Sequence, residues 1–356
     1  MYQVPIPPLD PAQRRALDLV RGARRFLLSG HVRPDGDCIG AQAALARVLA
    51  ALGKEACILN PDPPEACFDY LARECEFGVY DGGELPPHDV CVLLDISELP
   101  RCGALEEPLR RAPSKKLVVD HHIHRGDAWW DEAFVDVTAS ATGLLVYRMA
   151  RALEVPLDPV AAHGVFTSLV TDTGWFKYSN TDAETLGVAG ELVAGGVEPA
   201  ALFGSIYQRS QAGQPRAVGS LLRRLEYFAD GRLAVVDWPL ASEAREPLDG
   251  SDTVLDILRA VEGVDVVLFL RELEDGSCKL SARSKTAYDV QELASRFGGG
   301  GHAKAAGATL AGPLEDARGS VVAAALAALE ESGRGSPPDG RPPGPTALEP
   351  PVGRKA

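Results

Sequence analysis

Long hydrophobic runs are missing from this sequence. Apolar stretches such as the one from Phe26 to Leu28 or from Leu117 to Val119 end after a few residues at a glycine or a charge. A membrane-spanning helix needs roughly 20 apolar residues. We therefore expect no transmembrane helix and no membrane partner.

Cysteine is also scarce and follows no pattern. The seven cysteines are an odd number, they contain no Cys-x-x-Cys pair, and no secretory segment stands at the N-terminus. Such a set argues against a disulfide framework. We expect reduced thiols and a cytoplasmic location.

Positive charge is in deficit, with 36 Lys and Arg against 50 Asp and Glu, a formal net charge of -14. Proteins that coat long nucleic acids use basic surfaces that displace counterions. The charge balance therefore argues against a long duplex partner. An anionic substrate would need a locally positive site.

The composition that remains is that of a folded protein. The 356 residues are 46% hydrophobic and 24% charged, enough apolar material for a sizeable core and a length that suggests about two domains. Short apolar runs alternate with amphipathic stretches, the rhythm of an α/β sheet. The expected strands are 25–29, 56–60, 90–95, 116–120 and 133–137, and the expected helices are 40–52, 142–153, 158–170 and 183–194.

A second αβ unit follows a helical stretch at about 199–227. It is expected to contain strands at 233–238, 264–270, 278–284 and 307–310, a hairpin turn at Asp275-Gly276, and helices at 254–261, 290–297 and 314–331. The fold class is therefore α/β: an N-terminal domain with a mostly parallel sheet sandwiched by helices, and a smaller α/β C-terminal domain across a cleft. We expect an N-terminal domain at 1–198, a helical connector at 199–228, a C-terminal domain at 229–331 and a disordered Pro/Gly-rich tail at 332–356.

Acidic residues and histidines follow three strands of the first domain. His31, Asp35 and Asp37 follow the first, Asp95 ends another, and Asp120-His121-His122 ends the next. Ligands of open parallel sheets bind at the carboxyl ends of strands, so these clusters are expected to meet in one crevice. A single Asp in such a place is more often a turn former or helix cap. Three such clusters favour a metal site, and oxygen and imidazole donors without thiolate suit manganese or magnesium.

Two further segments contain candidate functional residues. Asp172 stands where a helix is expected to end, and it has a metal interpretation only beside the other clusters; alone it would belong to a helix-terminating turn. The run Gly298 to Gly301 before His302 would ordinarily be a flexible linker. Its place between a helix and a strand also allows backbone amides to approach a phosphate.

Taken in order, HVRPDGD, the strand end at Asp95, DHH, TDTGWFKYSNT and GGGGHAKAAG resemble the signature set of the DHH phosphoesterase superfamily with its DHH-associated C-terminal domain. The resemblance covers about residues 25–310. Within the superfamily the sequence is most similar to the small bacterial group of nanoRNases and 3′-phosphoadenosine 5′-phosphate (pAp) phosphatases. It departs from relatives at Ala41, where Ser is frequent, and at Leu144, where Glu is frequent.

The resemblance implies two divalent cations per subunit, manganese above all, with magnesium or cobalt as alternatives. One would be held by His31, Asp35 and Asp95, and the other by Asp37, Asp95, His121 and Asp172. The implied catalytic residues are Asp95, His122, which would contact the scissile phosphate, and Asp120, which would orient His121. The implied substrate contacts are Arg101, Ser281, Arg283, Ser284, Gly299, Gly300, Gly301 and His302.

The activity implied is metal-dependent hydrolysis of short oligoribonucleotides to mononucleotides, together with dephosphorylation of pAp. Alternatives are a cyclic or linear dinucleotide phosphodiesterase, a single-strand DNA exonuclease, an inorganic pyrophosphatase and a non-catalytic nucleotide sensor. The GGGGHAKAAG segment argues against a pyrophosphatase, and the complete ligand set argues against a sensor. The resemblance leaves a homodimer open.

Overall fold

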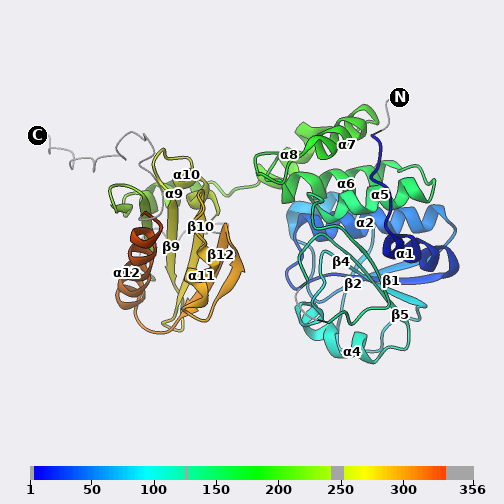
Figure 1. Ribbon diagram of the computed structural model, residues 1–356, viewed down its shortest axis with the longest axis horizontal. Coiled ribbons are helices and arrows are strands. Elements are labelled where there is room, and N and C mark those ends of the chain that lie inside the picture. The colour runs from blue at the N-terminus through cyan, green and yellow to red at the C-terminus, as the bar shows by residue number, and fades with distance from the viewer. Residues whose placement is uncertain (1–3, 125–126, 242–251, 334–356) are drawn as a thin grey trace, which may run out of the picture. The chain divides into compact units, whose positions relative to one another are not determined.

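The computed structural model describes residues 4–124, 127–241 and 252–333. It divides into two compact units, Met1–Arg209 and Ser210–Ala356, which we describe separately (Figure 1). The boundary lies inside the segment predicted as a helical connector. The predicted disordered tail, apart from residues 332 and 333, lies outside the described residues.

A six-stranded parallel sheet forms the centre of the first unit, which confirms the predicted fold class. Its strands are β1 (Arg25–Ser29), β2 (Glu55–Asn60), β3 (Phe77–Val79), β4 (Val90–Leu94), β5 (Lys115–Asp120) and β6 (Glu132–Val135). The spatial order is β3-β2-β1-β4-β5-β6. The order reverses between β1 and β4, and in doubly wound sheets such a switch point is where ligands bind.

Helices cover both faces of this sheet (Figure 1). One face packs against α1 (Pro11–Gly22), α2 (Gly36–Ala51), α5 (Thr142–Ala152) and α6 (Pro159–Asp172), and the other against the 3₁₀ segment η2 (Leu99–Leu105) and α4 (Glu106–Arg111). Strand alternation explains the division, because Phe26 and Leu28 join the first core and Leu27 joins the second. The remaining elements are η1 (Ala66–Phe68), α3 (Asp69–Ala72), α7 (Ala183–Ala194) and α8 (Pro199–Tyr207).

Helices α2 and α6 pack unusually closely at two glycines. A Cβ atom built on Gly40 would lie 2.3 Å from the carbonyl oxygen of Gly164, and one built on Gly164 would lie 2.5 Å from the carbonyl oxygen of Gly40. Both distances are far below van der Waals contact, so neither position has room for a side chain. The two helices therefore touch backbone to backbone beside the carboxyl ends of the strands.

The second unit is built on a mixed sheet ordered β11-β12-β10-β9-β8-β7. Its strands are β7 (Glu226–Phe228), β8 (Leu233–Trp238), β9 (Val266–Glu272), β10 (Cys278–Ser284), β11 (Gly300–His302) and β12 (Ala305–Leu310). Helices α11 (Val290–Ser295) and α12 (Leu314–Gly333) cover one face. Helices α9 (Gln214–Leu222) and α10 (Asp252–Arg259) cover the β8–β9 part of the other.

The predicted connector is not one continuous helix. It consists of α8 in the first unit, α9 in the second, and the edge strand β7. The short edge strands β3, β7 and β11 and the helix α1 were not predicted. Among the described residues no single helix is long and apolar enough to span a membrane; α7 and α8 pass that test only as a pair bent by 108°.

Candidate metal centre and nucleotide-binding face

The turn after β1 presents the first group of candidate ligands. His31 is 5% exposed, and its Nδ1 lies 2.9 Å from the carbonyl oxygen of Val32, to which it must donate. Its Nε2 faces Asp95, at 3.3 Å from Oδ2. Asp35 caps α2 by accepting hydrogen bonds from the amides of Asp37 and Cys38. The helix therefore begins at Gly36 rather than at the predicted residue 40, and Asp37 lies in its first turn.

Asp95 follows β4 directly and lies at the centre of the site. Its carboxylate is almost completely buried, and its backbone is in the left-handed region with φ 61°. Its amide still donates to the carbonyl of Val119 on β5, so the strand pairing fixes the unusual backbone. Asp tolerates this conformation better than most residues, and such conformations concentrate at functional sites.

The residues at the end of β5 are oriented differently from the prediction. Asp120 does not contact His121; its Oδ1 accepts a hydrogen bond from Nδ1 of His122 at 2.8 Å. His121 instead has its Nδ1 3.1 Å from the carbonyl oxygen of Ala139. Asp120 therefore orients His122. Residue spacing alone could not decide which neighbouring ring the buried carboxylate would reach.

Asp172 ends α6, as predicted, and a residue not identified from the sequence holds it. The side-chain amide of Asn180 donates to Oδ2 of Asp172 at 3.2 Å and to the carbonyl of Ser140 at 3.0 Å. Asn180 lies within the TDTGWFKYSNT segment. Its presence in that motif was the signal that could have identified it.

The candidate ligands form groups that fit cations. Their ligand atoms lie within 4.8 Å of one another in three sets: His31, Asp35 and Asp95; Asp37, His121 and Asp172; and Asp95, His121 and His122. Nδ1 of His121 donates to a carbonyl, so in the neutral ring Nε2 carries a lone pair. That atom is buried without a hydrogen-bond partner and lies 3.4 Å from Asp37 Oδ2 and 3.7 Å from carboxylate oxygens of Asp95 and Asp172. A lone pair facing carboxylates is a donor set for a divalent cation.

The pKa shifts of these residues also favour a cation site. Burial, together with the charge of Asp37, raises the pKa of Asp172 to about 7, and burial among carboxylates raises the pKa of Asp95 well above its usual range. Burial alone would also raise the pKa of Asp120, but the hydrogen bonds and charge of His122, together with Ser97, outweigh it and lower that pKa. Burial would lower the pKa of His122, but Asp120 raises it. Burying these carboxylates close together costs electrostatic free energy, and bound divalent cations would offset that cost.

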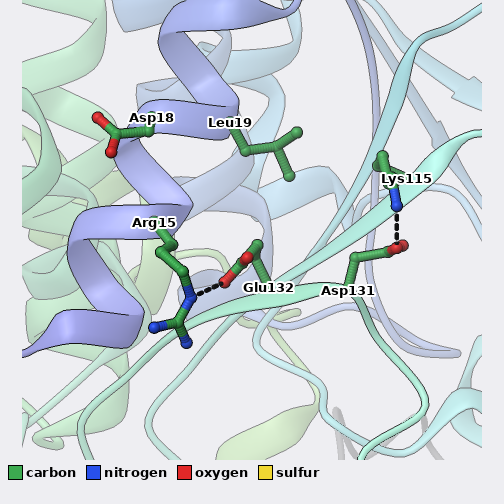
Figure 2. A pocket seen from close by; sticks show the side chains of 6 residues that line it. All are labelled: Arg15, Asp18, Leu19, Lys115, Asp131 and Glu132. Atoms are coloured by element: carbon green, nitrogen blue, oxygen red, sulfur yellow. Dashed lines mark hydrogen bonds and ion pairs between the residues drawn. The ribbon is translucent and has the colours of Figure 1, made fainter.

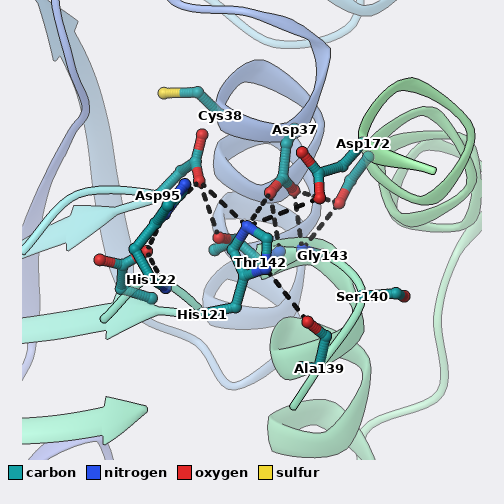
Figure 3. Close-up of polar contacts among 12 residues, drawn as sticks. Asp37, Cys38, Asp95, His121, His122, Ala139, Ser140, Thr142, Gly143 and Asp172 are labelled. Atoms are coloured by element: carbon teal, nitrogen blue, oxygen red, sulfur yellow. Dashed lines mark hydrogen bonds and ion pairs between the residues drawn. The ribbon is translucent and has the colours of Figure 1, made fainter. Parts of the chain in front are cut away.

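Four residues that the sequence did not identify support Asp37, Asp95 and His121, and three of them, Ala139, Thr142 and Gly143, are labelled in Figure 3. Ala139 accepts the hydrogen bond from His121, and the amide of Thr142 donates to Asp37 while its hydroxyl donates to Asp95. Gly143 and Ser168 also donate to Asp37. All four lie outside the motifs, so the sequence carried little signal for them.

One face of the second sheet contains two of the predicted substrate contacts. Ser281 and Arg283 lie on the half-exposed side of β10, whereas Ser284 is 2% exposed on the opposite side and hydrogen-bonds to the carbonyl of Thr286. The prediction that Ser284 contacts substrate is therefore wrong, because successive strand residues point to opposite faces.

The predicted glycine loop is partly a strand. Gly300 pairs with Gly307 and Gly301 with Ala306 in the antiparallel β11–β12 ladder, and Gly299 immediately precedes β11. Gly300 is exposed, on the sheet edge. The side chain of His302 lies outside the described residues, so its predicted contact stays a prediction.

Arg101 lies in η2, with an exposed side chain. Its carbonyl accepts a hydrogen bond from the amide of Val32 at 2.8 Å. The backbone of η2 is thus tied to the turn that carries His31. Its predicted phosphate contact stays a prediction.

A pocket elsewhere on the first unit has a different character (Figure 2). It lies where β5 begins, whereas the candidate metal ligands lie where β5 ends, and both of its basic side chains pair with acids of the same lining. Arg15 contacts Glu132 at 3.0 Å, and Lys115 contacts Asp131 at 2.6 Å. With its charges paired internally, this pocket is a poor candidate for an anionic substrate.

Comparison with known proteins agrees with this geometry. The model of the DHH family, N-terminal domain, matches residues 25–168, and that of the DHHA1 domain matches residues 240–331. The bifunctional oligoribonuclease and PAP phosphatase NrnA of Thermus thermophilus is 36% identical over 86% of this chain and 90% of its own length. The protein of the same description from Bacillus subtilis is 25% identical over 80% of this chain and 89% of its own.

Among solved structures, an exopolyphosphatase-related protein from Bacteroides fragilis superposes with a TM-score of 0.81 and 23% identity, covering 90% of this chain and 97% of that one. At this identity the likeness establishes the fold. The two domain matches and the Thermus relative establish the family. The chain belongs to the DHH phosphoesterases that carry a DHHA1 domain.

Proposed function

We propose that this protein hydrolyses short oligoribonucleotides to mononucleotides and dephosphorylates pAp, using two divalent cations. The observation that carries the proposal is the pair of ligand groups that meet at Asp95, at the switch point of the parallel sheet. The names of the Thermus and Bacillus relatives, which describe both activities, support the substrate class.

His31, Asp35 and Asp95 would hold one cation, and Asp37, Asp95, His121 and Asp172 the other. When bound, two cations supply an activated water and stabilise charge on the attacking and leaving oxygens at phosphorus. The donors are carboxylates and imidazoles without thiolate, which suits manganese, with magnesium or cobalt as substitutes. The cations also offset the acidic ligands and let a negatively charged protein accept an anion.

His122 is placed to contact the phosphate. Its side chain is 28% exposed, and its Nδ1 donates to the fully buried Asp120. This hydrogen bond fixes the ring and leaves Nε2 on its opposite side, where it can meet a phosphate oxygen. Asp120 acts through His122 in this arrangement and does not touch substrate.

The second sheet has a face suited to nucleotide contacts. Lys279, Ser281 and Arg283 share one face of β10, and the neighbouring β12 places Thr309, Gly307 and Ala305 opposite them. Small residues flanked by basic side chains allow a base or sugar to approach the backbone while a phosphate meets Arg283 or Lys279. We propose Ser281 and Arg283 as the contacts, in a cytoplasmic enzyme whose partners are small nucleotides rather than long duplexes.

A substrate panel tests the proposal. With manganese supplied, the full-length protein should hydrolyse pAp and di- to pentaribonucleotides faster than a 20-mer RNA, single-stranded DNA, a cyclic dinucleotide or pyrophosphate. Asp95→Asn should abolish both favoured activities. Asp131→Asn, which alters an acid at the other end of the sheet, should retain them.

Each failure has a distinct meaning. An equal or faster rate on the 20-mer would refute the preference for short substrates. A cyclic dinucleotide or pyrophosphate as the best substrate would replace the proposed activity. Full activity in Asp95→Asn would refute the shared ligand.

A further inference from the structure

The Asp37 carboxylate accepts hydrogen bonds from groups that are not themselves candidate ligands. The amide of Thr142 donates to its Oδ2 at 2.8 Å, and the amide of Gly143 donates to its Oδ1 at 3.2 Å (Figure 3). Both amides belong to the first turn of α5. The hydroxyl of Ser168, on α6, donates a hydrogen bond to Oδ1.

The direction of the Ser168 hydrogen bond is fixed by its surroundings. Ser168 is completely buried, and its Oγ accepts a hydrogen bond from the Gly143 amide at 2.7 Å. An amide can only donate, so the hydroxyl hydrogen is available for Asp37. A Cβ on Gly143 would lie 2.2 Å from this oxygen, so the arrangement requires glycine there.

The two carboxylate oxygens of Asp37 therefore have different partners. Oδ1 accepts hydrogen bonds from Ser168 and Gly143, while Oδ2 accepts one from the Thr142 amide and faces Nε2 of His121 at 3.4 Å. Asp35, in the other ligand group, has a side chain 62% exposed. Its Oδ1 accepts only from amides of its own helix among the described hydrogen bonds. The group of Asp37, His121 and Asp172 is therefore preorganised at Asp37, whereas the group of His31, Asp35 and Asp95 has one exposed member, Asp35.

The close contact of α2 and α6 makes the Ser168 hydrogen bond possible. A Cβ on Gly40 would lie 2.9 Å from the backbone nitrogen of Ser168, besides its overlap with Gly164. The two glycines therefore set the distance between the helix that carries Asp37 and the helix that carries Ser168.

We propose that Ser168 is a positioning residue for one of the two cation sites. By holding Oδ1 of Asp37, it keeps Oδ2 turned toward His121 and Asp172, and it raises the affinity of that site without affecting the site at His31 and Asp35. This inference rests on the proposed two-cation function. It assigns the tighter site to the group that includes Asp37.

Manganese binding to the full-length protein tests this assignment. Free Mn²⁺ is measured by electron paramagnetic resonance during titration of the wild type, Ser168→Ala and Ser168→Cys. The wild type should bind two equivalents, the tighter of which weakens about 10-fold or more in Ser168→Ala, the range expected when a partner of a metal ligand is removed. The weaker equivalent should not change. Ser168→Cys, which is similar in size but a weak donor, should resemble Ser168→Ala.

Thr167→Val is the matched control. Thr167 is the preceding residue on α6 and is also completely buried, but its hydroxyl bonds to the carbonyl of His163 and to Tyr70. Urea unfolding of the metal-free proteins measures any general destabilisation. Thr167→Val should lose stability yet bind Mn²⁺ as the wild type does.

Three results would overturn the inference. These are unchanged binding in Ser168→Ala, wild-type binding in Ser168→Cys, or an equal loss of affinity in Thr167→Val. Absence of Mn²⁺ binding by the wild type would instead refute the cation sites themselves, and with them the proposed function.

Discussion

Replacing Gly40 with alanine should force α2 and α6 apart. The new Cβ would lie 2.3 Å from the Gly164 oxygen and 2.9 Å from the Ser168 nitrogen, and both are backbone atoms that no rotamer change can move. The first contact is about 1 Å shorter than ordinary van der Waals contact. Overpacking of this kind costs about 1–3 kcal/mol. We expect a net loss near the upper end of that range, because the better helix propensity of alanine, about 1 kcal/mol, offsets only part of the cost at a contact this tight.

Gly190→Ala provides the opposite case. Gly190 also lies inside a helix, α7, but a Cβ there would meet no atom within 4 Å. Only the propensity gain remains, so this variant should be about 0.5–1 kcal/mol more stable than the wild type. Urea denaturation of the metal-free proteins, followed by circular dichroism, measures both. The reasoning would be refuted if Gly40→Ala were as stable as Gly190→Ala.

Two further predictions concern the salt bridges of Arg148, which is almost completely buried and contacts Asp136 at 2.7 Å and Glu184 at 2.6 Å. Arg148→Met leaves two acids without their cationic partner and should lower the free energy of unfolding, measured by urea denaturation, by about 3–5 kcal/mol. Arg47→Met breaks a half-exposed pair with Asp158 and should lower it by at most about 1 kcal/mol. Equal losses would contradict this prediction. Burial opposes ionisation of Asp136, but hydrogen bonds from Thr138 and Arg148 hold its pKa below its usual range. Ionised Asp136 therefore stabilises the fold above about pH 4, and that stability is lost as pH falls through the lowered pKa. Unfolding curves from pH 7 to pH 2 should show Asp136→Asn less stable than the wild type at the upper end, with the gap closing toward pH 2; a constant gap would count against the ionic contribution.

The sequence was sufficient to predict which strand ends meet. Local patterns located β1, β4 and β5, and the rule for parallel sheets then brought His31, Asp95 and His121 together. The short edge strands were missed because three residues carry too little periodicity to stand out. The helix α2 was predicted to begin four residues late because Asp35 and Asp37 were interpreted only as parts of a ligand loop, although Asp35 is also the helix cap.

Contacts that depend on side-chain direction were harder to predict. Asp120 reaches His122 rather than His121, and Ser284 lies on the opposite face of its strand from Ser281 and Arg283. The second error could have been avoided, since alternation along β10 is a local property. Ser168 could not have been found, because its contact with Asp37 joins residues 131 positions apart through the packing of two helices.

The position of the site at the switch point between β1 and β4 also determines when, during synthesis, all of its candidate ligands are present. His31 comes from the strand that starts one half of the sheet and Asp95 from the strand that starts the other, while Asp172 ends α6, far downstream. A nascent chain leaving the ribosome therefore completes the ligand set only after nearly the whole first unit has been synthesised. The ligand set proposed for the cations is complete only once these strands and helices have packed together. This contrasts with small zinc domains, where the metal drives folding.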